Sequence, residues 1–497
     1  MKSIPLLTKL QTFLSEPLDV KLQRSIATDV EAHVLDLFHT VVNSVPAYRQ
    51  FLQLQGIDPA SIQTLAAFQQ LPLVTKANYI KQYPLAEICR AGSLSTCDML
   101  AVSSGSTGEP TCWPRQISDE LEIATRFEYI FRESFQADRR STLAVICFAL
   151  GTWVGGMYTA ACCRWLATKG YQIAVITPGN NKTEILRVVQ ALGGQFEQMV
   201  LLGYPPFLKD VVDTGIQQGV RWSDYAVKLV MAGEVFSEEW RLLVGQRLSS
   251  TDYYYDSAAL FGTADAGVLG HETPLSICIR QFLATHPDAA RQLFGESRLP
   301  TLVQYDPTSR FFEVHEGTLL FSGDNGVPLI RYHIADTGGV ISYETMLQFL
   351  QDWGFDPLAV LETDRGVHAL PFVYVFGRSQ FAISYFGANL YPENIAVGLE
   401  QPAIQDWVTG KFVMQIIEDE DGNRFLSVTV ELAPGVDAER DKAQSISRAI
   451  VAQLRRLNSE FANYVPTEYQ QPQITLKPMG DPDFFPVGVK HSYTRSI

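Results

Sequence analysis

A chain of 497 residues, with 46% hydrophobic and 19% charged residues, is longer than one hydrophobic core usually organises, so the sequence predicts a globular protein of two or more domains. The net charge of -15 argues against broad binding to nucleic acids or anionic membranes, because those surfaces require a basic face and no Lys/Arg run is present. Seven cysteines without a C-x-x-C pair fit reduced thiols in a cytoplasmic protein better than a disulfide framework or a structural zinc site.

The N-terminal region does not have a signal-peptide pattern, because Lys9 and Glu16 interrupt its short apolar patch. Apolar residues then recur at helical spacing from Val30 to Val45, and Pro46 follows. This spacing predicts an amphipathic helix that ends at the proline. A Pro-flanked segment, Leu71 to Lys76 (LPLVTK), leads on toward the first motif.

The stretch from Ala101 to Arg115 (AVSSGSTGEPTCWPR) is rich in glycines and hydroxyl side chains. Such a loop lets backbone N–H groups and hydroxyls approach a polyphosphate closely, although the same residues also suit an ordinary surface turn. The stretch lacks the Gly-Lys-Ser/Thr ending of a Walker loop, so a P-loop NTPase of the usual kind is not supported. The candidate phosphate-binding residues are Ser103, Ser104, Gly105, Ser106, Thr107 and Gly108.

Between residues 142 and 232, short apolar runs alternate with polar, helix-like stretches. The runs TLAVICF, YQIAVITPGNN, QMVLLGYPP and VKLVMAGE are nearly continuous in apolar residues at their starts, which is typical of strands covered on both faces. Helices are expected over Lys182 to Leu192 and over Ser237 to Leu248, with Ser237 as the N-cap. This order predicts a largely parallel sheet, and ligands of such sheets collect where the strands end.

The segment from Thr142 to Cys163 contains no charged residue, and its length alone would allow it to span a membrane. Gly151, Gly155 and Gly156 divide it, as expected of a buried strand, a loop and a helix. We therefore expect no membrane span here.

The C-terminal third is rich in strand-forming residues. Residues 311 to 343 predict a hairpin-rich subdomain. The strand-like runs FVYVFG, FAISYFG, KFVMQII and FLSVTVEL follow, with Asp421-Gly422 as a hairpin turn and a helix over Asp437 to Leu457. These elements predict a small C-terminal α+β domain.

Further motifs follow the serine-rich stretch in a defined order. They are Phe261-Gly262-Thr263-Ala264-Asp265, Pro328 to Asp336 (PLIRYHIAD), and Gly377-Arg378-Ser379-Gln380 with Phe386 to Ile395 (FGANLYPENI). Together with the serine-rich stretch, they resemble the motifs of the adenylate-forming enzymes, especially the phenylacetate-CoA ligase-like branch. Two shorter strings, Met231-Ala232-Gly233-Glu234 and Gly488-Val489-Lys490, are similar to the adenine-side loop and the C-terminal lysine motif of that family.

The resemblance implies an α/β fold with two parts. The larger part, residues 1–376, would contain parallel and mixed sheets with helices and a β-rich subdomain, and it would bind ATP and the acid. The smaller part, residues 377–497, would be a mobile α+β lid, with a hinge near residues 377–380.

The resemblance also implies a role for each motif. The serine-rich loop would hold the β- and γ-phosphates of ATP, Asp265 would bind Mg²⁺, and Asp336 would accept hydrogen bonds from the ribose hydroxyls. Lys490 would contact the acid carboxylate and the α-phosphate. The remaining nucleotide-site residues would be Gly233, Glu234, Phe261, Gly262, Thr263 and Arg378.

Three aromatic residues near the predicted strand ends, Phe148, Trp153 and Tyr204, are candidates for an apolar acyl pocket. They would favour an aryl or other apolar acid. The same residues are equally what the interior of a buried sheet contains.

The expected activity is the ATP-dependent conversion of a carboxylic acid to an acyl-adenylate, followed by transfer to a thiol, with coenzyme A as the leading acceptor. The phosphopantetheine of an acyl carrier protein, an alcohol or an amine are alternative acceptors, and a homodimer is compatible with the resemblance. A nucleotide-binding homologue with weak or no catalysis is the second alternative, because three positions depart from the family pattern. They are Glu109 in place of lysine, Asp265 in place of glutamate and Gln380 in place of the hinge aspartate.

Overall fold

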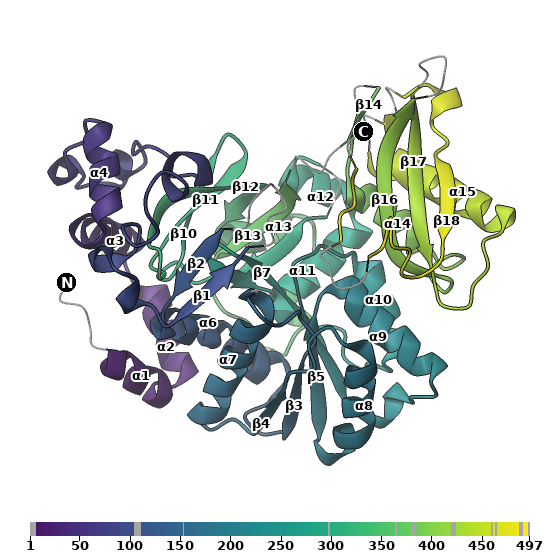
Figure 1. Cartoon of the computed structure of the whole chain (residues 1–497), viewed down its shortest axis with the longest axis horizontal. Helices are drawn as coiled ribbons and strands as arrows, with labels where there is room; N and C mark the ends of the chain where they lie inside the picture. The colour runs from purple at the N-terminus through teal and green to yellow at the C-terminus, as the bar shows by residue number, and fades with distance from the viewer. Residues whose placement is uncertain are drawn as a thin grey trace.

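The structure is a computed structural model, and it describes residues 6–103, 111–152, 154–296, 299–362, 365–378, 383–386, 388–418, 424–458, 461–462, 465–486 and 491–495. A large eleven-stranded sheet with helices on both faces forms most of the molecule, and a separate three-stranded sheet lies in a C-terminal unit beside it (Figure 1). The predicted α/β fold class is confirmed.

The helices of the described chain are α1 (Leu6–Ser15), α2 (Leu18–Ala27), α3 (Val30–Ser44), α4 (Pro46–Leu54), α5 (Leu65–Phe68), α6 (Ile117–Tyr129), α7 (Val154–Lys169), α8 (Lys182–Leu192), α9 (Pro205–Gln217), α10 (Glu238–Arg247), α11 (Pro274–Thr285), α12 (Pro287–Phe294), α13 (Tyr343–Asp352), α14 (Pro392–Leu399) and α15 (Arg440–Leu457). The strands are β1 (Met99–Val102), β2 (Cys112–Arg115), β3 (Thr142–Ile146), β4 (Ile173–Ile176), β5 (Gln198–Gly203), β6 (Val227–Ala232), β7 (Ser257–Thr263), β8 (Gly267–His271), β9 (Thr301–Gln304), β10 (Phe311–His315), β11 (Thr318–Gly323), β12 (Leu329–Ile341), β13 (Phe372–Arg378), β14 (Ile383–Tyr385), β15 (Ala388–Leu390), β16 (Val408–Glu418), β17 (Arg424–Leu432) and β18 (Gln473–Lys477).

The parallel half of the large sheet follows the order β4-β3-β5-β6-β7. All six residues of β5 are buried, as the continuous apolar pattern predicted. Helices α6 and α7 pack on one face of this half, and α8, α9 and α10 pack on the other. The Ser237 hydroxyl accepts a hydrogen bond from the Trp240 N–H at 2.9 Å, which confirms the predicted N-cap of α10. Because these strands are parallel, their carboxyl ends lie at the same edge of the sheet, and the loops that follow the strands lie there too.

The antiparallel half corrects two expectations. The run FVYVFG was assigned to the small C-terminal domain, but it forms β13, which pairs with β12 and β9 inside the large sheet. Residues 311 to 343 form the predicted hairpins, because β10, β11 and β12 pair antiparallel in chain order, but these strands continue the same eleven-stranded sheet. A strand pattern predicts that a segment is extended and half-buried, but it does not specify the strand with which it pairs.

Helices α3, α4 and α5 pack against this antiparallel half. Helix α3 ends at Ser44, as predicted, and Pro46 is the first residue of α4 rather than the start of a loop. Phe38, Tyr48 and Phe68 share a core with residues of β10 to β13. Val74 then pairs with β12, because its N–H donates to Arg331 O at 3.1 Å and its carbonyl accepts from His333 N at 2.9 Å. The segment that precedes Lys76 is thus fixed to the sheet.

The C-terminal unit has its own core. Strands β16 and β17 are antiparallel, β18 is parallel to β17, and α14 and α15 cover the sheet. Helix α15 confirms the helix predicted over Asp437 to Leu457, and the predicted turn at Asp421-Gly422 lies outside the described residues. Within the described ranges, the apolar segment from Thr142 to Cys163 contributes β3 and part of α7, and none of the helices has the length and apolarity that crossing a membrane requires.

Candidate active site

A cavity of about 1530 Å³ lies between the ends of the parallel strands and the C-terminal unit. It is bordered by ten of the residues that the sequence predicted for the nucleotide and acyl sites. These residues are Ser103, Phe148, Tyr204, Gly233, Glu234, Phe261, Gly262, Thr263, Asp265 and Asp336. Residues that are far apart in the sequence therefore share one cavity, as the order of the motifs requires.

The described residues on either side of the serine-rich segment lie close together at the cavity. Strands β1 and β2 pair antiparallel, with Val102 opposite Cys112. Ser103 closes the pair, because its N–H donates to Thr111 O at 3.0 Å and its hydroxyl accepts from Thr111 N at 3.0 Å. Val102, Ser103 and Thr111 all border the cavity. Ser104 to Gly108, together with Glu109, lie outside the described residues.

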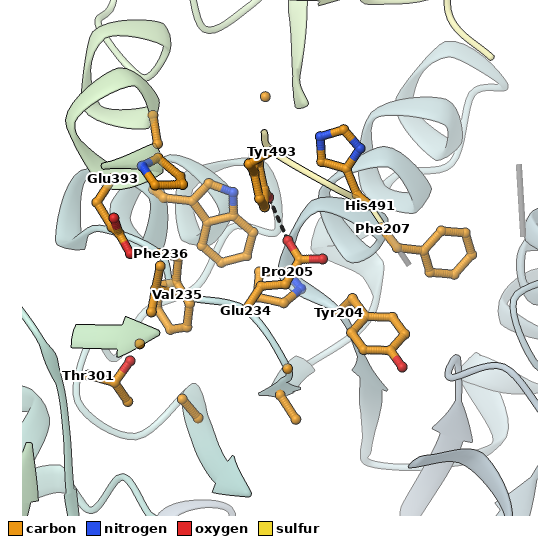
Figure 2. A pocket seen from close by; sticks show the side chains of 18 of the residues that line it. Tyr204, Pro205, Phe207, Glu234, Val235, Phe236, Thr301, Glu393, His491 and Tyr493 are labelled. Carbon is orange, nitrogen blue, oxygen red and sulfur yellow. Dashed lines mark hydrogen bonds between the residues drawn. The ribbon is translucent and has the colours of Figure 1, made fainter. Parts of the chain in front are cut away.

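The loop after β6 carries Gly233 and Glu234. Gly233 has a φ of +88°, and a Cβ at this position would lie 2.7 Å from Cε1 of Tyr204, so only glycine fits here. Glu234 accepts a hydrogen bond from the Tyr493 hydroxyl at 2.5 Å, shown by the dashed line in Figure 2. Burial and the adjacent Glu234 carboxylate raise the pKa of Tyr493 well above its usual value, so the phenol remains protonated and can donate.

Tyr493 reaches the cavity because the last described residues run along β16. Met414 N donates to Tyr493 O at 2.8 Å, and Arg495 N donates to Met414 O at 3.3 Å. The Tyr493 ring packs against Phe412, with ring centroids 4.9 Å apart. Lys490 lies outside the described residues, but His491, which follows it, borders the cavity. No feature of the sequence singled out Tyr493.

Aromatic side chains form the wall below the loops after β3 and β5. The rings of Phe148 and Tyr204 meet edge to face, with centroids 5.0 Å apart, and both border the cavity. Figure 2 shows Tyr204, Phe207 and Glu234 among the residues that line this pocket. Gly155 lies against the Phe148 ring, which a Cβ would approach to 3.6 Å. Trp153, the third predicted acyl-pocket residue, lies outside the described residues.

The end of β7 supplies Phe261, Gly262 and Thr263. Phe261 is 9% exposed and stacks on Phe312 with centroids 6.5 Å apart, so only part of its ring is accessible from the cavity. A Cβ on Gly262 would lie 2.5 Å from Gly267 O, which explains the glycine in β7 where the strand pairs with β8. The Thr263 hydroxyl accepts from Ala266 N at 3.1 Å and closes the turn that carries Asp265.

The carboxylate of Asp265 is buried and both of its oxygens have partners. Lys76 Nζ lies 3.1 Å from Oδ1, and the Tyr332 hydroxyl donates to Oδ2 at 2.6 Å. In the part of the chain that the structure describes, no group of three or more His, Cys, Asp or Glu side chains is placed to hold a metal ion. Mg²⁺ is usually held by one or two carboxylates together with substrate phosphates, so a role of Asp265 toward the metal of Mg·ATP stays a prediction. Sequence reasoning missed Lys76 as a site residue, although it ends the LPLVTK segment that leads to the motifs.

Asp336 lies on β12, opposite Arg378 of β13, and is 7% exposed at the edge of the same cavity. The preceding residue, Ala335, has a φ of 65°, which is the left-handed region that favours glycine. Such a conformation costs about 1–2 kcal/mol for a residue with a Cβ, which accounts for the glycine that the resembling motif has at this position. Only the backbone of Arg378 is described, and Gln380 is outside the described residues.

No protein-family model and no curated protein matches the sequence. Among solved structures, 2-hydroxyisobutyryl-CoA ligase in the postadenylation state, in complex with R3-HIB-AMP, is 13% identical and matches with a TM-score of 0.65 over 100% of this chain and 93% of that chain. The same ligase in the thioesterification state, in complex with 2-HIB-AMP and CoA, is 13% identical and matches with a TM-score of 0.53 over 99% of this chain and 94% of that chain. The similarity includes the C-terminal unit, since nearly the whole of each chain is covered. The chain therefore has the fold of the adenylate-forming acyl-CoA ligases.

Proposed function

We propose that the chain is an ATP-dependent acid–thiol ligase that forms an acyl-adenylate. In the first step, a carboxylate oxygen of the acid attacks the α-phosphorus of ATP and pyrophosphate leaves. In the second step, the sulfur of a thiol attacks the acyl carbon, AMP leaves, and the thiol proton passes to solvent. The observation that carries the proposal is the single cavity that Ser103, Glu234, Asp265 and Asp336 share, since each comes from a different motif.

The roles follow from the chemistry of the side chains. The serine-rich segment binds the β- and γ-phosphates through hydroxyl and N–H donors, and Asp336 accepts hydrogen bonds from the ribose diol. The loop of Gly233 and Glu234, with Phe261 to Thr263, forms the adenine side. Lys490 supplies the positive charge at the reacting carboxylate and α-phosphate. ATP enters as its magnesium complex, and no step is assigned to a metal bound by Asp265.

The acid is proposed to be an aryl or other apolar acid, as in the phenylacetate-CoA ligase-like branch. Support comes from the edge-to-face pair of Phe148 and Tyr204 and from the lack of a side chain at Gly155, which leaves room beside that pair. Coenzyme A is the proposed acceptor. The solved ligase that matches nearly the whole chain is a CoA ligase, which favours this acceptor over a carrier protein.

Residues 377–497 are proposed to act as a lid that changes position between the two steps, with the hinge near residues 377–380. The C-terminal unit supports this proposal because it has its own core and a separate sheet. Polar contacts such as that between Tyr493 and Glu234 join it to the large sheet. Interfaces of this kind allow relative motion of domains.

The test is acid-dependent exchange of labelled pyrophosphate into ATP, measured with a panel of aryl and fatty acids. We expect exchange with at least one aryl acid and none without acid. Purified enzyme is then given coenzyme A, a phosphopantetheinylated carrier protein or an amine, and AMP release identifies the acceptor. Binding of ATP without exchange across the panel would instead support a nucleotide-binding homologue without catalysis.

A further inference from the structure

Lys76 is held in a fixed position by the segment around it. It begins a short π-helical turn, Lys76–Ile80, that Thr75 and Asn78 cap reciprocally: the Thr75 hydroxyl accepts from Asn78 N at 3.0 Å, and the Asn78 side chain accepts from Thr75 N at 2.7 Å. Val74, two residues earlier, is hydrogen-bonded to β12. The same strand carries Tyr332 and Asp336. The backbone of Lys76 is therefore joined to the strand that supplies the proposed ribose ligand.

The ammonium group of Lys76 is directed to Asp265 and remains accessible. Its Nζ lies 3.1 Å from Asp265 Oδ1, and the Lys76 side chain is 30% exposed at the cavity. An ammonium group has three N–H donors, so the ion pair with Asp265 leaves donors for a second anionic partner. Tyr332 in turn holds the Asp265 carboxylate through a hydrogen bond of 2.6 Å. Asp265 and Tyr332 thus orient Lys76 and leave N–H donors of its ammonium group for a second partner.

Lys76 also lies next to β2, the strand that follows the proposed phosphate segment in the sequence. Its Nζ is 5.7 Å from the ring centroid of Trp113, which is on β2, the strand that follows residues 104–110. Most other lysines that border the cavity are paired elsewhere: Lys182 with Asp210, Lys209 with Asp213, and Lys411 with Glu431. Among the described lysines at the cavity, Lys76 is the one that contacts a predicted nucleotide-site residue.

We propose that Lys76 binds the phosphate groups of ATP and supplies the fixed positive charge that the sequence assigned to a metal at Asp265. Asp265 is then a positioning residue for Lys76. This inference rests on the proposed function, because it assumes that ATP occupies the cavity. The acid carboxylate and the polyphosphate of ATP are both anions and must approach each other during the reaction. The ammonium group lowers the repulsion between them.

The experiment measures ATP binding by calorimetry in EDTA and in Mg²⁺, on the full chain and on Lys76→Met, Lys76→Arg and Lys81→Met. Lys81 is the matched control, because it borders the same cavity and has no ion pair among the described residues. We expect Lys76→Met to weaken ATP binding in EDTA at least ~10-fold, as the loss of a charge-assisted hydrogen bond predicts. Lys76→Arg should recover part of this loss, and Lys81→Met should stay within about 3-fold of the wild type.

Asp265→Asn separates the two roles of the carboxylate. If Asp265 positions Lys76, the Mg²⁺ concentration that gives half-maximal pyrophosphate exchange stays within about 3-fold of the wild-type value, while ATP binding in EDTA weakens. A rise of ~10-fold or more in that concentration, with unchanged ATP binding in EDTA, would assign Asp265 to the metal and overturn the proposal. Equal ATP binding by wild type and Lys76→Met would also overturn it. Failure of the wild type to bind ATP would instead refute the proposed function, and thermal unfolding checks that each variant is folded.

Discussion

The two walls of the cavity are built differently. The wall of the large sheet comes from the ends of β5, β6 and β7, whose residues are almost all buried between two layers of helices. The C-terminal wall comes from a unit with its own core, which contacts the sheet wall through polar groups. These contacts are Tyr493 with Glu234, Glu400 with Ser237, Lys209 Nζ with Val408 O at 3.0 Å, and Arg247 with Asp406 at 3.0 Å.

Under the proposed function, this difference between the two walls would separate nucleotide binding from catalysis. A wall made of packed strands is preorganised, so its groups can bind the nucleotide without rearrangement. A wall attached by a few polar contacts can detach at small cost and bring different groups to the cavity in different steps. We therefore expect variants of the sheet wall to change ATP affinity, and variants of the C-terminal wall to change rates.

The largest effect is expected for Lys490→Ala, in the predicted lid. Removing a cation that acts on the transition state should lower the rate of adenylation at least ~100-fold while ATP affinity changes little. Single-turnover kinetics and calorimetry measure the two quantities. Lys477→Ala is the control, because this lysine pairs with Asp481 on the C-terminal unit at 3.4 Å and does not border the cavity. An unchanged adenylation rate would refute the role of Lys490.

The contribution of the large sheet to ATP binding is tested by Asp336→Asn on β12. The neutral amide replaces a carboxylate that is proposed to accept hydrogen bonds from the ribose, so ATP affinity should fall roughly 10- to 100-fold. Calorimetry with ATP and with 2′,3′-dideoxy-ATP checks the cause, because the variant should discriminate less between the two nucleotides. Asp288→Asn, at an exposed position of α12, is the control. The ribose assignment fails if discrimination between the two nucleotides is unaltered.

A smaller effect is expected where the two walls meet. Tyr493→Phe removes the hydrogen bond to Glu234, and we expect adenylation to slow about 10-fold with ATP affinity within about 3-fold. Tyr385→Phe is the matched control, since it removes a hydrogen bond of 2.8 Å to Tyr469 O within the C-terminal unit. Equal losses of rate in both variants would point to general destabilisation of the unit rather than to the contact across the cavity.

The smallest effect is a pH dependence of docking, which here means the contact of the C-terminal unit with the large sheet. Burial and the nearby Glu239 carboxylate raise the pKa of Glu400 to about 7, against the hydrogen bond from Ser237 and the charges of Arg280 and Lys209, which lower it. A raised pKa means that the docked state binds the proton more tightly. Docking is therefore strongest below the ordinary glutamate value of about 4.5 and is weakened as the pH rises through 7.

Glu400→Gln should remove this pH dependence, because the amide does not titrate. Hydrogen exchange of the α14 and β16 amides at pH 5.5 and 7.5, corrected for the intrinsic rates, measures docking. We expect protection to fall a few-fold at the higher pH in the wild type and to stay constant in the variant. The same fall in Glu400→Gln would show that another group titrates.

Much of this architecture could be predicted from the sequence. Nearly continuous apolar runs identified β3, β5 and β6, and the cap residue identified the start of α10, because these signals are local. The order of the motifs also predicted that Asp265 and Asp336 would border one cavity. The partners of β13 were not predictable, because pairing is decided by packing over the whole sheet. The ion pair of Lys76 with Asp265 and the contact of Tyr493 with Glu234 were missed for the same reason: each joins segments far apart in the sequence.

A crystal structure with a non-hydrolysable acyl-sulfamoyl adenosine tests most directly whether one nucleotide joins the two walls. We expect the ribose of the analogue within hydrogen-bonding distance of Asp336, its adenine beside Glu234 and Phe261, and its acyl group against Phe148 and Tyr204. An analogue bound in any other cavity, or bound here with the ribose away from Asp336, would contradict the proposed adenylation site.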